Sequence, residues 1–231
     1  MNLLAKTWIA SARATRVLGR RHRPREELVR RFAGDRSFAD IGCMWGVDGA
    51  IAFLAEETGA TEVTAVDLMP ASARFEAERK RRSSKVRFIR GDLHDEKVIG
   101  MVGRHDLVWC SGVLYHAPNP LLTLGRLRQI TGELLILATE TIPEVPGLSQ
   151  ACVFLPGLSA EDRRLHASAR PGVSAAGLSN AFDPAEAYGT WWWGLTRSAV
   201  RGMLQASGFE TLEEHGGPLH ATFLVRPLDR G

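Results

Sequence analysis

The 231-residue chain has few cysteines, few lysines and no long run of apolar residues. Its three cysteines, Cys43, Cys110 and Cys152, are widely spaced and odd in number, so the sequence contains neither a CxxC pair nor a disulfide framework. No stretch of about 18 apolar residues occurs, which excludes an ordinary transmembrane helix. These absences predict a protein of the reducing cytoplasm that makes no contact with a membrane.

The composition excludes further classes of protein. Hydrophobic residues make up 45% and charged residues 24% of the chain, so collagen-like, disordered and coiled-coil structures are excluded. The net charge of +3 and the pI of about 9.0 are too mild to indicate nucleic-acid binding by themselves. The histidines show no metal-ligand spacing, so we predict no metal site. The length suits one domain with an appendage.

The N-terminal region differs in composition from the rest of the chain. Residues 1–25 contain no acidic residue and are rich in arginine, with Leu4, Trp8 and Leu18 at roughly helical spacing. We interpret residues 1–36 as a helical cap on the domain, with a second helix over residues 25–32. A targeting segment is the alternative, because transit peptides share this composition.

From residue 37 onward, strand and helix patterns alternate with short connections. This alternation predicts an α/β, Rossmann-like doubly wound fold with a mostly parallel sheet of seven strands. The strands are expected at residues 37–41, 62–66, 85–90, 106–110, 133–138, 210–214 and 220–225. The helices between them are expected at residues 50–57, 70–81, 94–102, 120–130 and 196–207.

Two features distinguish the C-terminal half of the predicted domain, residues 37–231. Residues 141–190 are rich in Pro, Gly, Ser and Ala and too long for an ordinary connection, so we interpret them as a substrate-covering insertion. The last two strands face each other across Gly216-Gly217-Pro218, which predicts an antiparallel hairpin that closes the sheet.

Acidic residues follow three consecutive predicted strands. Asp40 precedes the glycine-rich turn Gly42 to Gly46, Asp67 ends the second strand, and Asp92 follows the third. Glycine lets the backbone approach a ligand closely, and an acid at the second strand accepts ribose hydroxyls. Since the carboxyl ends of parallel strands border one crevice, the sequence predicts a nucleoside site there.

The form of the turn indicates which nucleotide binds. A dinucleotide fingerprint requires G-x-G-x-x-G, whereas this turn has Met44 at the middle position and Asp40 before the first glycine. An acid at that point disfavours a diphosphate and suits an ammonium group. A ligand with a cationic amino-acid tail, a ribose and an adenine fits best, which describes S-adenosylmethionine (SAM), with S-adenosylhomocysteine (SAH) as its product.

The sequence resembles class I SAM-dependent methyltransferases. Asp40-x-Gly42-x-x-x-Gly46 is similar to their first motif. The segment Ser111-Gly-Val-Leu-Tyr-His116 resembles the GVLYH signature of a subgroup that includes the tRNA wobble-uridine carboxymethyltransferase and many small-molecule enzymes. Trp191 to Trp193 resemble the tryptophans of the same subgroup. Met44, and Leu195 where the subgroup often has proline, depart from the pattern.

The resemblance implies roles for individual residues. Asp40 would hold the turn and reach the methionine amine through water, and Asp67 would accept the ribose hydroxyls. Asp92 would accept from the adenine amine, while the Leu93 N–H would donate to a ring nitrogen. The remaining cofactor-binding positions implied are Gly42, Cys43, Gly46, Leu68, Ser111 and Gly112.

Aromatic and histidine residues are the candidates for the acceptor side. His116 is a candidate general base, with a turn-stabilising role as the alternative, and Tyr115 is a candidate to orient the acceptor or support the sulfonium. We predict that Tyr188, Trp192 and Trp193 bind the substrate, because three consecutive tryptophans cannot all face a core. Trp45 is expected to pack on the following helix.

The favoured function is transfer of the sulfonium methyl to an oxygen or nitrogen of a metabolite or natural product. The first alternative is a tRNA- or RNA-modifying methyl- or carboxymethyltransferase, for which no recognisable RNA-binding module is present. The second is an NAD-binding Rossmann dehydrogenase or a non-catalytic SAM-binding protein. Neither the acceptor nor the oligomeric state is predicted by the sequence.

Overall fold

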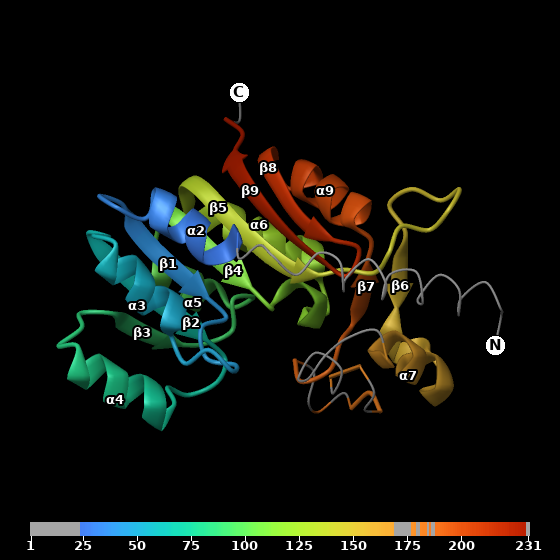
Figure 1. Cartoon of the computed structure of the whole chain (residues 1–231), viewed down its shortest axis with the longest axis horizontal. Helices are drawn as coiled ribbons and strands as arrows, with labels where there is room; N and C mark the ends of the chain where they lie inside the picture. Colours follow the sequence, from blue (N-terminus) through green and yellow to red (C-terminus); the bar gives the residue numbers. More distant parts are fainter. Residues whose placement is uncertain (1–23, 169–176, 179–180, 184, 186–187, 230–231) are drawn as a thin grey trace.

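A central sheet of seven strands organises the computed structural model, which describes residues 24–168, 177–178, 181–183, 185 and 188–229 (Figure 1). The strand order is β3-β2-β1-β4-β5-β9-β8, parallel from β3 to β5 and antiparallel at β9 and β8. The strands are β1 (Ser37–Ile41), β2 (Glu62–Asp67), β3 (Arg87–Arg90), β4 (His105–Ser111), β5 (Thr131–Glu140), β8 (Phe209–Gly217) and β9 (His220–Pro227). The predicted doubly wound sheet with its closing hairpin is confirmed.

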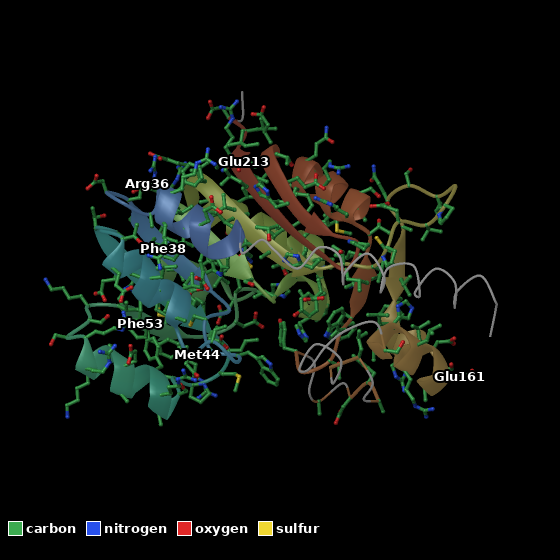
Figure 2. The ribbon with its side chains drawn as sticks, viewed as in Figure 1. Arg36, Phe38, Met44, Phe53, Glu161 and Glu213 are labelled. Carbon is green, nitrogen blue, oxygen red and sulfur yellow. The ribbon has the colours of Figure 1, made fainter. Side chains whose placement is uncertain are left out.

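Helices cover both faces of this sheet, and each face has its own hydrophobic core. One core contains side chains of helices α2 (Pro24–Phe32), α3 (Ala50–Glu57) and α4 (Ala73–Arg81). The other core contains side chains of helices α5 (Glu96–Val102), α6 (Pro120–Ile130) and α9 (Arg197–Ala206). Phe38 on β1 and Phe53 on α3, both labelled in Figure 2, belong to the first core.

Part of the insertion forms a second, two-stranded sheet beside the main one. Strand β6 (Cys152–Phe154) pairs antiparallel with β7 (Trp193–Leu195), and helix α7 (Ala160–Ser168) lies near β6 in Figure 1. Figure 2 places Glu161 on the outer side of α7. Residues 1–23 of the expected cap, and with them the possible targeting segment, lie outside the described residues, as do 169–176, 179–180, 184 and 186–187 of the insertion.

Capping residues explain most of the shifted helix boundaries. Helix α4 begins at Ala73 rather than at residue 70, because the Ser72 hydroxyl accepts from the Phe75 N–H (3.0 Å). Helix α5 begins after Asp95, whose carboxylate accepts from the Lys97 N–H (2.9 Å). The hairpin strands are longer than expected and extend through Gly217, so the turn lies at residues 218–219.

Two kinds of feature are absent from the described residues. None of the helices in that part of the chain has the length and apolar character needed to cross a membrane. No group of three or more His, Cys, Asp or Glu side chains there is arranged to hold a metal ion.

Candidate functional site

A cavity of about 570 Å³ opens where strands β1 to β4 end. The loops after these strands and the segment of residues 188–191 contribute most of its wall. Five carboxylates line it, whereas no arginine or lysine does among the described residues. The five are Glu26, Asp40, Asp67, Asp92 and Glu140.

The turn after β1 requires glycine at its first position. Gly42 has φ +82°, and a Cβ there would lie 2.6 Å from Val113 Cγ2 and 2.8 Å from the Ser111 carbonyl oxygen. Both distances are shorter than carbon atoms tolerate, so a side chain would push the β1 and β4 loops apart. Gly46 also has positive φ (+70°), but it faces open space. Of these two glycines, Gly42 is therefore the one that limits how closely the two loops approach.

Asp67 joins the loops after β1 and β2. Its Oδ2 accepts from the Met44 N–H (2.7 Å) and its Oδ1 accepts from the Met69 N–H (2.8 Å). Burial raises the pKa of this carboxyl, and the backbone hydrogen bonds oppose that shift. Each carboxylate oxygen can accept more than one hydrogen bond, so Asp67 can also accept from a ligand in the cavity.

Asp40 lies deeper, at 1% exposure, near the start of α3. Its Oδ2 accepts from the Ala52 N–H (3.1 Å), which satisfies one amide of the first helical turn. Desolvation raises the pKa of the Asp40 carboxyl to about 7, and the charge of Asp67 adds to this effect. A cation bound nearby would favour the ionised carboxylate.

We expect the ligand-free protein to lose stability as the pH rises from about 4 to about 7. Asp40 stays protonated in the folded state over this range and is ionised in the unfolded state, so the folded state binds the extra proton. The free energy of unfolding should fall by a few kcal/mol, on the order of 1.4 kcal/mol per pKa unit. The measurement is urea denaturation against pH. The Asp40→Asn variant, whose amide oxygen can still accept from Ala52, should show a flatter profile, and an unchanged profile would contradict the assignment to Asp40.

Both carboxylate oxygens of Asp92 accept hydrogen bonds. Oδ1 accepts from the His94 N–H (2.8 Å), and Oδ2 accepts from the Tyr188 hydroxyl (2.8 Å). His94 is fixed in turn, because its Nε2 lies 2.7 Å from Thr123 Oγ1. Tyr188 therefore contacts the third acid, Asp92, which the sequence did not predict.

His116 and Tyr115 follow β4 in the short 3₁₀ helix Leu114–His116. His116 Nδ1 lies 2.9 Å from the Thr190 carbonyl oxygen. A carbonyl only accepts, so Nδ1 carries the proton and Nε2 is the basic nitrogen of the neutral ring. Burial lowers the pKa of His116, which favours this neutral form. The Tyr115 ring lies between His116 and Trp191, with centroid distances of 4.3 and 4.1 Å.

Trp45 does not pack on the following helix as expected, since it is 62% exposed and borders the cavity. Three more exposed apolar side chains border the cavity with it: Val47, Leu68 and Met69. The loops after β1 and β2 therefore give the mouth of the cavity an apolar rim.

Most of the predicted cofactor residues line this cavity. They are Asp40, Gly42, Asp67, Leu68, Asp92, Leu93, Ser111 and Gly112. Cys43 and Gly46 do not border it, because the buried Cys43 points into the core and Gly46 lies at the outer part of the turn.

The tryptophan that lines the cavity is not one of the two predicted to bind substrate. Trp191, at 3% exposure, lines the cavity, whereas Trp192 and Trp193 are not among its described lining residues. Trp192 packs edge-on against Phe182 (4.8 Å between centroids), and Trp193 Nε1 donates to the Pro118 carbonyl (3.1 Å). The predicted substrate contact of Trp192 and Trp193 therefore has no support from this arrangement.

Several cavity residues were not predicted from the sequence. His94, Trp109, Val113, Thr123, Glu26 and Glu140 all border the cavity. The strand-end positions of His94 and Glu140 are a signal that could have identified them, because each follows or ends a parallel strand at the same edge of the sheet. Glu26 gave no such signal, since it comes from helix α2.

Part of the chain matches a known family, and its fold matches solved structures. Residues 39–133 match the family described as a methyltransferase domain. The N-terminal domain of EvdMO1, solved with SAH bound, is 17% identical with a TM-score of 0.59, covering 89% of this chain and 81% of that one. The Burkholderia thailandensis 1,6-didemethyltoxoflavin-N1-methyltransferase, solved with 1,6-didemethyltoxoflavin and SAH, is 15% identical with a TM-score of 0.59, covering 98% and 88%.

The fold also serves another chemistry. The [4+2]-cyclase SpnF is 13% identical with a TM-score of 0.57, covering 88% of this chain and 80% of that one. At such identities the structural likeness establishes the shared fold alone, and the family match over residues 39–133 is the evidence from sequence. No curated protein matches the chain significantly.

Proposed function

This chain carries a class I SAM-dependent methyltransferase domain, and from that premise we propose that it transfers the sulfonium methyl of SAM to an oxygen or nitrogen of a small-molecule acceptor. The observation that carries the proposal is the convergence of Asp40, Asp67 and Asp92 on one cavity beside the Gly42 turn. Bound SAM supplies an activated methyl group on a cationic sulfur. The remaining chemistry is positioning and proton removal by residues of the chain.

The residues that line the cavity offer partners for each part of this cofactor. Asp67 has acceptor capacity for the two ribose hydroxyls, and Leu68 borders the same space. Asp92 is assigned to the adenine amine, with the Leu93 N–H for a ring nitrogen. The backbone of Gly42, with Ser111 and Gly112, is assigned to the methionine tail. Cys43 and Gly46 do not border the cavity, so they are left out of this assignment.

His116 is proposed as the base where the acceptor nucleophile carries a proton. Its Nδ1–H is held by the Thr190 carbonyl, so Nε2 is the nitrogen able to accept. It borders the cavity together with Tyr115, whose ring we assign to orienting the acceptor or to cation–π support of the sulfonium. Methyl transfer itself is an in-line displacement that depends mainly on orientation and desolvation.

Aromatic walls favour a planar or apolar acceptor of small size. Tyr115 and Trp191 border the cavity. Residues 141–190 are proposed as the substrate-covering insertion of a domain that spans residues 37–231. The 1,6-didemethyltoxoflavin bound in the Burkholderia thailandensis methyltransferase is a small molecule, which is consistent with an acceptor of this size here. A cytoplasmic location stays a prediction.

The charge of the cavity bears on two alternatives: carboxylated SAM as the cofactor and RNA as the acceptor. A carboxylated SAM requires a basic partner, and the described cavity residues include five carboxylates but no arginine or lysine. RNA would likewise bring phosphates toward these carboxylates. Both observations favour plain SAM and a small acceptor over RNA modification.

The test is a calorimetric titration of SAH into the purified protein, followed by incubation with methyl-labelled SAM. We expect SAH to bind, label to enter a small phenol or amine from a panel of acceptors, and RNA to stay unlabelled. An NAD control should show no binding. Labelled RNA would favour the tRNA- or RNA-modifying alternative. SAH binding without methyl transfer to any acceptor would favour a non-catalytic SAM-binding protein or a cyclase-like use of the fold. Absence of SAH binding would contradict the proposal.

A further inference from the structure

The contact between Tyr188 and Asp92 lies where the adenine is proposed to bind. Asp92 Oδ1 accepts from the N–H of His94, two residues further along the chain, so this oxygen stabilises the local turn. The other oxygen, Oδ2, accepts from the Tyr188 hydroxyl at 2.8 Å, across 96 residues of sequence. Both Asp92 and Tyr188 border the cavity. The oxygen that would receive the adenine amine therefore already accepts a hydrogen bond from a side chain of the insertion, which lies at the same place in the cavity.

We propose that Tyr188 gates the cofactor site by holding the hydrogen-bonding position of the adenine amine until the cofactor displaces it. This inference rests on the proposed function, because it takes Asp92 as the adenine acceptor. It moves Tyr188 from the acceptor side, where the sequence placed it, to the cofactor side. The insertion and the cofactor then compete for one carboxylate oxygen.

The two competing donors are chemically equivalent toward Asp92. A phenol O–H and an exocyclic amine N–H each donate one hydrogen bond to a carboxylate, and neither carries a charge. Burial and the Asp92 carboxylate both raise the pKa of Tyr188, so the phenol keeps its proton at neutral pH. The exchange of one donor for the other therefore requires no proton transfer.

Tyr188 also contacts His94, which lies beside Asp92. Its ring meets the His94 ring edge-on at 6.2 Å, and its hydroxyl lies 3.4 Å from His94 Nδ1. His94 is held in place from its other side by Thr123. Tyr188 is partly exposed, and among its contacts with described residues the hydrogen bond to Asp92 is the shorter of two polar ones (2.8 Å against 3.4 Å).

The residues that follow Tyr188 are anchored separately. The Thr190 carbonyl accepts from His116, the Trp191 ring lies on Tyr115, and the Trp192 N–H donates to the Tyr115 carbonyl (2.9 Å). Gly189 alone separates Tyr188 from this anchored segment, and glycine tolerates a large change of backbone angles. Tyr188 can therefore leave Asp92 without moving His116.

The gate predicts that removal of the phenol hydroxyl tightens cofactor binding. If the Tyr188–Asp92 contact is formed in about nine of ten ligand-free molecules, the apparent Kd is about tenfold above its intrinsic value. Tyr188→Phe keeps the ring and removes only the donor. We expect SAH to bind this variant about tenfold more tightly than the wild type, measured by isothermal titration calorimetry.

Two matched variants complete the test. Tyr115→Phe removes the hydroxyl of the only other tyrosine in the chain, which borders the same cavity but has no hydrogen bond to Asp92 among the described contacts, and it should not tighten SAH binding. In an Asp92→Ala background, Tyr188→Phe should have no further effect on SAH binding, because the shared acceptor is gone.

Each other outcome has a distinct meaning. Unchanged or weaker SAH binding by Tyr188→Phe would overturn the gate, and weaker binding would indicate that the phenol stays on Asp92 beside the adenine. SAH binding by Tyr188→Phe that a further Asp92→Ala substitution leaves unaffected would overturn the gate and the adenine assignment together. Failure of the wild type and of every variant to bind SAH would contradict the proposed function itself.

Discussion

Replacement of Asp67 by alanine is expected to weaken SAH binding by about 10²–10⁴-fold, since each of the two hydrogen bonds to a charged group contributes about 1.5–3 kcal/mol. The variant would lose the proposed acceptor of both ribose hydroxyls. It would also leave the Met44 and Met69 amides without the carboxylate that holds the loops after β1 and β2 in place. Isothermal titration calorimetry with SAH measures the effect, and methyl transfer should fall in parallel.

A second aspartate of the sheet provides the control for this experiment. Asp106 accepts from the Ser37 N–H (2.9 Å) and from the Ser37 hydroxyl (2.7 Å), near the start of β1 and β4 and away from the cavity. Asp106→Ala should lower the free energy of unfolding and leave the SAH affinity unchanged. Equal affinity losses in the two variants would indicate a general loss of structure and would contradict a cofactor role for Asp67.

Replacement of His116 by alanine is expected to lower kcat by about 10²–10⁴-fold, the usual contribution of a general base, while SAH binds with nearly unchanged affinity. The base works only when neutral. Because burial lowers the pKa of His116 below its ordinary value of 6.5, wild-type kcat should stay constant near neutral pH and fall only in more acidic solution. Initial rates with an acceptor found in the labelling panel, measured from pH 5 to pH 9, give both results.

A second substitution at this position separates catalysis from structure. The side-chain amide of His116→Asn can still donate to the Thr190 carbonyl, but it has no titratable nitrogen. If His116 is the base, both variants should be slow and neither should show the acidic fall of kcat. Near wild-type activity of His116→Asn would assign the histidine to stabilisation of the turn. His94→Ala, which removes another histidine of the same cavity, should keep the acidic fall.

The local elements of the fold were predictable because their signals are local. The helices over residues 50–57 and 120–130 have the predicted boundaries, and Thr196 caps α9 as expected, accepting from the Ala199 N–H. Each depends on apolar periodicity and on a capping group within a few residues. The starts of α4 and α5 were predicted too early, although Ser72 and Asp95 are capping residue types, because a periodic pattern extends past the cap.

The acids at the site were predictable for a topological reason. Asp40, Asp67 and Asp92 follow consecutive strands that alternate with helices, and parallel strands place their carboxyl ends at one edge of the sheet. The chain therefore encodes their convergence through its order of elements, without any knowledge of side-chain packing.

The environments of the aromatic residues could not be predicted from the sequence, because they depend on tertiary contacts. The sequence shows only that three consecutive tryptophan side chains cannot all have the same environment. Which one lines the cavity follows from the pairing of β7 with β6 and from the contact of Trp191 with Tyr115. Likewise, Tyr188 meets Asp92 across 96 residues, and no local pattern encodes a contact of that range. The order of strands and helices thus determined the fold and the row of acids, whereas the insertion's contacts depended on packing between distant segments, which periodicity does not record.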